Sequence, residues 1–136
     1  MPDRAYIKPP WWMLAIGNRF SVLNRKMIAR LSVPGRRSGR LRTTPVVVLE
    51  HEGDRYLIAP FGNTEWVRNL RAARHGRLDQ GGRVEQFVPV EISPADRPPL
   101  IEAYLKRYGR APKVASSFRQ LPDPADHPTF RINAVA

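Results

Sequence analysis

The 136-residue sequence contains no cysteine. Without thiols the chain can form neither a disulfide, nor a thiolate metal site, nor a cysteine nucleophile. No apolar run approaches the length of a membrane-spanning helix or has the form of a signal peptide. The three histidines, His51, His75 and His127, lack the spacing of metal ligands, so we expect no metal site and surface positions for all three. These absences indicate a cytoplasmic protein.

The sequence also lacks acidic residues over a long stretch. Between Asp3 and Glu50 there is no aspartate or glutamate, whereas the rest of the chain is nearly balanced in charge. The whole chain has 23 lysines and arginines against 12 acidic residues, a formal net charge of +11. A positive field over one half of the molecule favours a polyanionic ligand, a nucleic acid or an acidic membrane surface.

The segment Pro34–Pro45 holds four arginines and two glycines between two apolar runs. A glycine-flanked turn directs backbone N–H groups outward and favours an anion. Arginine adds planar forks that match phosphate and carboxylate oxygens. The segment therefore predicts a phosphate-binding hairpin, with an ordinary solvated basic turn as the alternative.

The remaining pattern is of the α+β class. Apolar residues at helical spacing predict an amphipathic helix over about residues 11–31, and a valine-rich run predicts a strand at 44–50. We expect further strands at 55–59, 77–80, 83–92 and 129–135, and helices at 64–73, where Thr64 is a candidate N-cap, and from Ser93 to about Tyr108. Hairpins in this number predict a small antiparallel barrel or a curled sheet. The chain length predicts a single domain over residues 1–136, with the helix at 11–31 and the barrel at 32–136.

A second informative segment runs from Ala59 to Arg71. Here a strand ends, a glycine loop follows, and a helix begins with free N–H groups that favour an anionic or electron-rich ligand. Trp66 and Leu70 lie on one helical face, where Trp66 is expected to anchor the core. Asn69 lies beside that face, and a half-buried amide needs hydrogen-bond partners in the protein or in a ligand.

Together, the sequences GRRSGRLRTTP and WVRNLRA, with a strand–turn–strand between them, resemble the deazaflavin-dependent nitroreductase family. The resemblance covers about residues 32–78. It implies a split β-barrel that binds coenzyme F420, with FMN as the less favoured cofactor. It also implies hydride transfer between the reduced deazaflavin and an electron-poor acceptor, such as an activated alkene, a quinone or a nitro compound.

The resemblance also implies a set of cofactor contacts. Arg37 and Arg42 would hold the cofactor phosphate, with help from Arg36 and Ser38. The ring system and the loop over it would involve Thr44, Pro45, Ala59, Pro60, Phe61, Gly62, Trp66 and Asn69. The family loop commonly carries Ser-Lys-Gly-Gly, whereas this chain has Pro-Phe-Gly-Asn, so the lysine contact is missing and Phe61 is expected to pack on the ring or the substrate. No catalytic residue is assigned; Tyr104 and Tyr108 are candidates either for packing or for proton donation.

Other classes of function stay open at this stage. Trp11 and Trp12 at the head of a basic amphipathic helix are typical of a peripheral membrane anchor, although they could equally pack on the barrel or at a homodimer interface. A nucleic-acid partner is not expected, because aromatic residues do not alternate with the arginines and no known nucleic-acid motif appears. The alternatives to the F420 enzyme are therefore an FMN-binding split barrel and a basic membrane- or nucleic-acid-binding module without enzyme activity.

Overall fold

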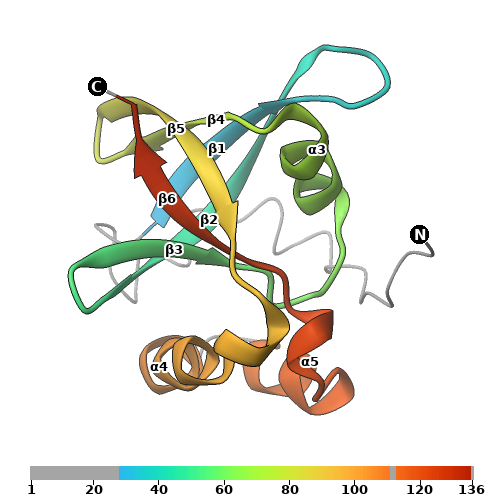
Figure 1. The fold of residues 1–136 in the computed structure, drawn as a ribbon, viewed down its shortest axis with the longest axis vertical. Helices are drawn as coiled ribbons and strands as arrows, with labels where there is room; N and C mark the ends of the chain where they lie inside the picture. The colour runs from blue at the N-terminus through green and yellow to red at the C-terminus, as the bar shows by residue number, and fades with distance from the viewer. Residues whose placement is uncertain (1–27, 111–112, 136) are drawn as a thin grey trace.

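The computed structural model describes residues 28–110 and 113–135. Within them six antiparallel strands close into a barrel in the order β1-β2-β3-β6-β5-β4 (Figure 1). The strands are β1 (Ile28–Pro34), β2 (Leu41–His51), β3 (Asp54–Ile58), β4 (Gly76–Gln80), β5 (Arg83–Glu91) and β6 (Thr129–Ala134). The helices are α3 (Glu65–Ala73), α4 (Pro98–Tyr108) and α5 (Val114–Gln120), with short 3-10 turns η2 (Pro94–Asp96) and η3 (Pro124–Asp126). This architecture is consistent with the predicted split barrel.

Strand β2 contains an uninterrupted apolar run from Pro45 to Leu49, because both of its faces are covered there. Successive side chains of a strand point to opposite faces. Val46 and Val48 enter the barrel core, whereas Val47 and Leu49 pack with α4 and α5 outside it. Because both faces are covered, the usual alternation of apolar and polar residues disappears in this strand.

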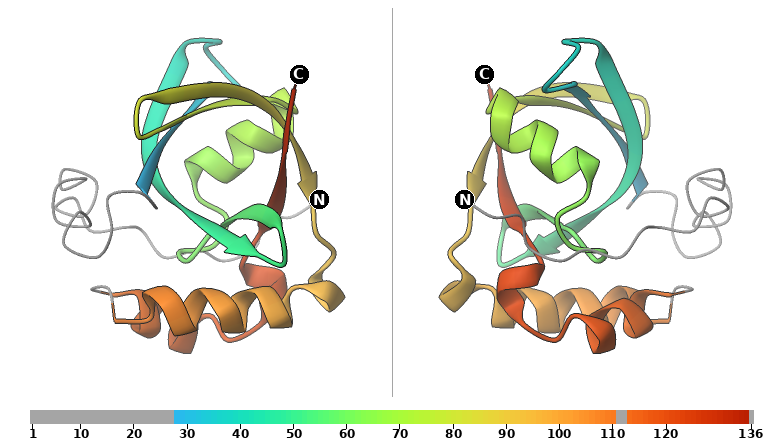
Figure 2. Two further views of the ribbon diagram at one scale, coloured as in Figure 1. Left: turned by 90° about the vertical axis from the view of Figure 1, so that its left-hand side faces the viewer. Right: turned by 90° about the vertical axis from the view of Figure 1, so that its right-hand side faces the viewer.

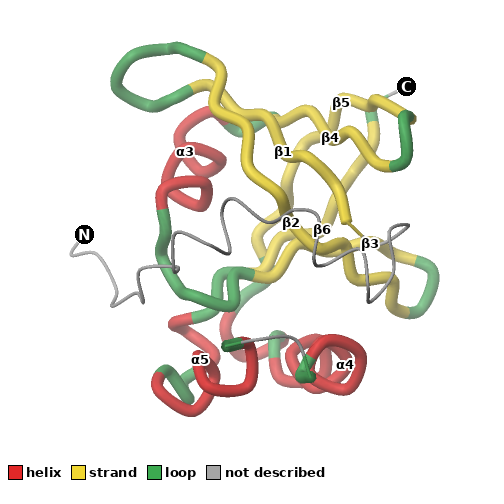
Figure 3. Tube along the Cα trace, turned by 180° about the vertical axis from the view of Figure 1, so that it is seen from behind, coloured by secondary structure: helices red, strands yellow, loops and turns green. Residues whose placement is uncertain are grey.

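The helices lie at two ends of the barrel. In Figures 1 and 3 the turn between β1 and β2 projects beside α3, and α4 and α5 lie together at the opposite end. Figure 2 shows α3 crossing the barrel opening, with α4 below the strands. Val67 and Leu70 of α3 belong to the barrel core, whereas Tyr104 and Phe118 of α4 and α5 belong to the second cluster. Strand β2 is thus bordered by both groups of helices.

Most of the predicted elements are confirmed, two predictions are wrong, and one helix was not predicted. The helix expected at 11–31 cannot reach Leu31, because Ile28–Pro34 is strand β1, paired with β2 on one side and β4 on the other; its remainder, including Trp11 and Trp12, lies outside the described residues. Helix α5 was not predicted, since its sequence VASSFRQ has only two large apolar residues. His127 was expected at the surface but is buried, because its ring stacks on Phe118 at 4.0 Å.

Candidate functional site

The described residues enclose a cavity of about 720 Å³ that extends along β2, a volume within the usual range for ligand pockets. One end is basic and polar, and the other end is apolar. The basic end is lined by Gly35, Arg36, Arg37, Ser38 and Arg42. The apolar end is lined by Ile28, Val47, Ile58, Tyr104 and Val114. The cavity therefore suits an elongated ligand or a pair of ligands with an anionic group at one end.

The turn at the basic end is held by its own backbone. Gly35 N donates to Arg40 O at 2.7 Å, and Gly39 N donates to Gly35 O at 2.8 Å. Gly39 has φ of 73°, a conformation that favours glycine. The Ser38 hydroxyl accepts a hydrogen bond from Arg40 N at 3.2 Å. These bonds fix the turn that carries the exposed side chain of Arg37. Arg42, also exposed, follows in strand β2 and lines the same end of the cavity.

Arg36 has a different environment from the other arginines of the turn. Its Nη1 donates to Glu65 Oε2 at 2.6 Å and to Asn69 Oδ1 at 2.9 Å, and its backbone N donates to the same Asn69 oxygen at 3.1 Å. The hydrogen bond from Arg36 lowers the pKa of the Glu65 carboxyl. Arg36 and Asn69 thus fasten the basic turn to the start of α3. The Asn69 amide was expected to need hydrogen-bond partners in the protein or in a ligand. For its oxygen, the partner is Arg36 of the protein.

The loop between β3 and α3 contributes only some of its residues to the cavity. Pro60 and Phe61 line it, whereas Ala59 and Gly62 do not. Ala59 is buried in the core, where its carbonyl oxygen lies 2.9 Å from His127 Nδ1 and its N–H donates to Pro128 O. Gly62 has φ of 87°, so it supplies the turn conformation of the loop. These two predicted contact residues shape the loop without lining the cavity.

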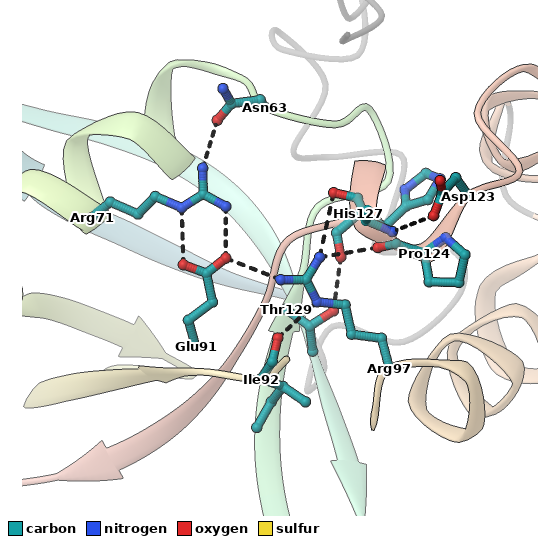
Figure 4. Close-up of polar contacts among 10 residues, drawn as sticks. Asn63, Arg71, Glu91, Ile92, Arg97, Asp123, Pro124, His127 and Thr129 are labelled. Atoms are coloured by element: carbon teal, nitrogen blue, oxygen red, sulfur yellow. Dashed lines mark hydrogen bonds and ion pairs between the residues drawn. The ribbon is translucent and has the colours of Figure 1, made fainter. Parts of the chain in front are cut away.

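A network of charged side chains holds the other end of this loop (Figure 4). Arg71 Nη1 donates to Asn63 Oδ1 at 3.2 Å, and its Nε and Nη2 donate to the Glu91 carboxylate at 2.9 and 2.6 Å. Arg97 Nη2 donates to the same carboxylate at 3.1 Å. Arg97 is 3% exposed and also donates to the carbonyl oxygens of Ile92, Pro124 and Ala125. The network links α3, the end of β5 and the turn before β6.

The remaining predicted residues line the cavity. Thr44 and Pro45 of β2 do so, as does Trp66 of α3. The Trp66 ring also packs on the barrel core, with its centroid 6.1 Å from that of Phe130. Trp66 therefore has the expected core role and still presents part of its side chain to the cavity.

The two tyrosines of α4 differ in their contacts. Tyr108 donates from its hydroxyl to Val48 O at 3.1 Å, so it packs and hydrogen-bonds against the barrel. Tyr104 is buried and lines the apolar end of the cavity. Burial, with a smaller contribution from Tyr108, raises the pKa of Tyr104, so its hydroxyl stays protonated at neutral pH.

Several lining residues were not predicted. Leu31, Val33, Val46 and Ile58 resemble ordinary core residues in the sequence, and Val114 belongs to the helix that was missed. Thr64 and Glu65 also line the cavity; the prediction used them only as the cap and first turn of α3. Their position directly after the Pro60–Asn63 loop was the available signal.

A second, shallow hollow adjoins the basic end of the cavity. Its lining residues are Arg36, Arg37, Asn63, Arg68, Arg71 and Ala72. Four guanidinium groups meet there, with Glu65 and Glu91 as the carboxylates that pair with Arg36 and Arg71. Since Arg36 and Arg37 line both spaces, positive charge continues from the cavity mouth across one face of α3.

Two kinds of feature are absent from the part of the chain that the structure describes. Residues 28–110 and 113–135 contain no cluster of three or more potential metal ligands of the His, Cys, Asp or Glu type. Over the same ranges no helix is both long enough and apolar enough to cross a membrane.

Three solved structures show the same fold at low identity. An F420-H2 dependent reductase, FDR-A, is 20% identical with a TM-score of 0.59, over 79% of this chain and 95% of that one. A structure described as a domain-swapped dimer is 20% identical with a TM-score of 0.61, over 79% and 81%. A protein of unknown function from Agrobacterium tumefaciens is 19% identical with a TM-score of 0.64, over 98% of this chain and 60% of its own.

No protein with a curated description matches the sequence. A family model does match, over residues 14–120, and its description is F420H(2)-dependent quinone reductase. The match covers most of the chain and includes both the basic turn and α3. The chain therefore belongs to the F420H(2)-dependent quinone reductase family and is an F420-dependent oxidoreductase.

Proposed function

We propose that the chain transfers a hydride from reduced F420 to a quinone-type acceptor, with both molecules in the cavity along β2. The observation that carries this proposal is the polarity of the cavity, which has arginines at one end and apolar side chains at the other. The family description supports the choice of a quinone. Reduced F420 supplies the hydride when it is bound, and the protein supplies position, charge and exclusion of water.

The residues at the basic end fit the cofactor phosphate. In this proposal Arg37 and Arg42 bind the phosphate oxygens as charge-assisted donors. Ser38 assists by stabilising the turn, and Arg36 assists by fixing the position of the turn relative to α3, as their hydrogen bonds indicate. The adjoining hollow with Arg68 and Arg71 accommodates the carboxylates of the glutamate tail, which would account for much of the positive charge on this face.

The ring system would lie between Thr44 and Pro45 on one side and Pro60, Phe61 and Trp66 on the other. All five residues line the cavity. The acceptor would then occupy the apolar end, beside Val47 and Tyr104. An apolar surround favours a flat, uncharged acceptor over a charged one, because a charge would lose its hydration there.

This assignment of the acceptor end predicts a change in substrate affinity. Val47→Thr keeps the shape of the side chain but adds a hydroxyl, so the KM for an apolar quinone is expected to rise about three- to tenfold. The measurement is anaerobic oxidation of reduced F420 by a quinone, followed by absorbance. Val90→Thr is the matched control, because Val90 lies on β5, is 38% exposed and lies outside the cavity.

F420 affinity should be the same in both variants. Equal KM values for the quinone in both variants would place the acceptor elsewhere. No quinone-dependent oxidation in the unaltered protein would overturn the proposed acceptor class, with FMN titrated in parallel to check the cofactor.

Four further expectations about the protein and its surroundings remain proposals. Dimerisation is supported by the exposed valines Val84, Val88 and Val90 of β5 and Val135, which follows β6, since apolar patches often mark interfaces. Membrane contact through residues 11–31, a cytoplasmic location and a single domain over 1–136 rest on the sequence pattern alone.

A further inference from the structure

The hydroxyl of Thr64 lacks a hydrogen-bond partner. Thr64 is 9% exposed and lines the cavity, and among the described residues its Oγ1 is the buried side-chain polar atom without a partner. Its backbone is satisfied, because Thr64 N donates to Gly62 O at 2.8 Å and Thr64 O accepts from Arg68 N at 3.2 Å. The backbone N–H and carbonyl of Thr64 therefore have hydrogen-bond partners, and only its side-chain hydroxyl has none.

Helix capping, the usual role of a threonine at this position, does not provide the Thr64 hydroxyl with a partner. Thr64 is the N-cap of α3, where a threonine oxygen ordinarily accepts a hydrogen bond from an N–H of the first turn. That side-chain bond is not formed here. A buried hydroxyl without a partner loses its hydration with no compensating hydrogen bond, so this threonine is expected to destabilise the unliganded protein relative to an apolar residue of equal shape.

The surroundings indicate what the missing partner is. The first N–H groups of α3 have no partner within the helix, and with the helix dipole they favour an oxygen acceptor from a ligand. Thr64 lies between Phe61 and Trp66, which border the space proposed for the ring system, whereas the phosphate end is formed by the β1–β2 turn.

We propose that the Thr64 side chain, which lines the cavity while its oxygen is shielded in the unliganded protein, turns about its Cα–Cβ bond when F420 binds, so that the hydroxyl donates a hydrogen bond to an oxygen of the ring or sugar chain of F420. This contact rests on the proposed function. The free energy that the unpaired hydroxyl costs in the unliganded protein is then regained on binding. Thr64 thereby contributes to cofactor affinity.

Thr64→Val tests this contact, because it removes the hydroxyl and keeps the shape. Without F420 the melting temperature is expected to rise by about 2–4 °C. The dissociation constant for F420 is expected to rise about three- to tenfold. A merely structural role would move stability and affinity in the same direction, whereas the proposed contact moves them in opposite directions. The measurements are thermal unfolding of the unliganded protein and fluorescence titration with F420.

Thr129→Val is the matched control. The Thr129 hydroxyl is also buried but donates to His127 O at 3.0 Å, so its loss should lower the melting temperature and leave F420 affinity unchanged. Thr64→Ser keeps the hydroxyl and should retain the affinity. A deazaflavin with its sugar chain but without phosphate and glutamates should show the same loss with Thr64→Val as F420 does.

Three results would overturn the proposal. Unchanged F420 affinity in Thr64→Val would mean that water or another group satisfies the hydroxyl. A loss seen with F420 but not with the phosphate-free deazaflavin would move the contact to the phosphate. A lower melting temperature in Thr64→Val would mean that the hydroxyl already has a partner. Absence of F420 binding in the unaltered protein is a separate result, which would refute the proposed function itself.

Discussion

Replacing both Arg37 and Arg42 by alanine is expected to weaken F420 binding by about 30- to 1,000-fold. Both side chains are exposed at the cavity mouth, so each proposed charge-assisted contact with the phosphate would be reduced by solvent and would contribute about 1–2 kcal/mol. The loss should shrink as salt is added, because screening weakens exposed charge pairs. Fluorescence titration at low and high ionic strength measures both effects.

The control for this double variant removes the same charge elsewhere. Arg77 and Arg83 are exposed on the β4–β5 hairpin and line neither cavity. Their double alanine variant should bind F420 within about threefold of the unaltered protein, through the change in long-range field alone. Equal losses in the two double variants would show that net charge, and not the basic turn, attracts the cofactor.

Replacing Arg97 by methionine is expected to lower the free energy of unfolding by about 2–4 kcal/mol. The substitution leaves the carbonyl oxygens of Ile92, Pro124 and Ala125 without their buried donor, and Glu91 keeps only Arg71. Breaking a buried ion pair from one side is costly because the remaining polar groups stay buried. Chemical denaturation is the measurement.

Arg55→Met is the matched control for Arg97→Met. Arg55 pairs with Glu85, and the two side chains are 28% and 13% exposed. Because the substitution breaks this single ion pair, its loss should cost about 1–2 kcal/mol, less than the loss of Arg97. Arg97→Lys should lie between the two, because lysine keeps the charge but lacks the planar fork. Similar losses for Arg97→Met and Arg55→Met would contradict the structural role of the network in Figure 4.

Local patterns were enough to predict the hairpins and helix α3. Gly81 and Gly82 mark one turn, and the valine-rich run marks β2; each signal depends on residues close together in the sequence. The start of strand β1 was wrongly predicted as helix, because Ile28 and Leu31 continue the helical spacing of the preceding residues. Only pairing with two strands from other parts of the chain makes this segment extended, and tertiary pairing overrides local propensity.

The site was predictable where a motif carries its own chemistry. The basic turn and Trp66 were found in this way, and the cavity includes them. The apolar end was not predictable, because Ile58 and Val114 look like any core residues and come together only when α4 and α5 pack beside the barrel. The network around Glu91 and Arg97 was missed for the same reason, since its links to Arg71 and to Pro124 join segments that are far apart in the sequence and ordinary in composition.

The position of β6 determines the order in which the barrel can form. Its neighbours β3 and β5 precede it in the chain, and it pairs with both. Until β6 is in place, each of them presents an unpaired edge, which is a surface for association with other chains. Closure also needs contacts between segments far apart in sequence, and such contacts form slowly. In pulsed hydrogen exchange during refolding, the amides of β6 should therefore become protected after those of the β1–β2 hairpin, and aggregation should compete with folding until that last strand is inserted.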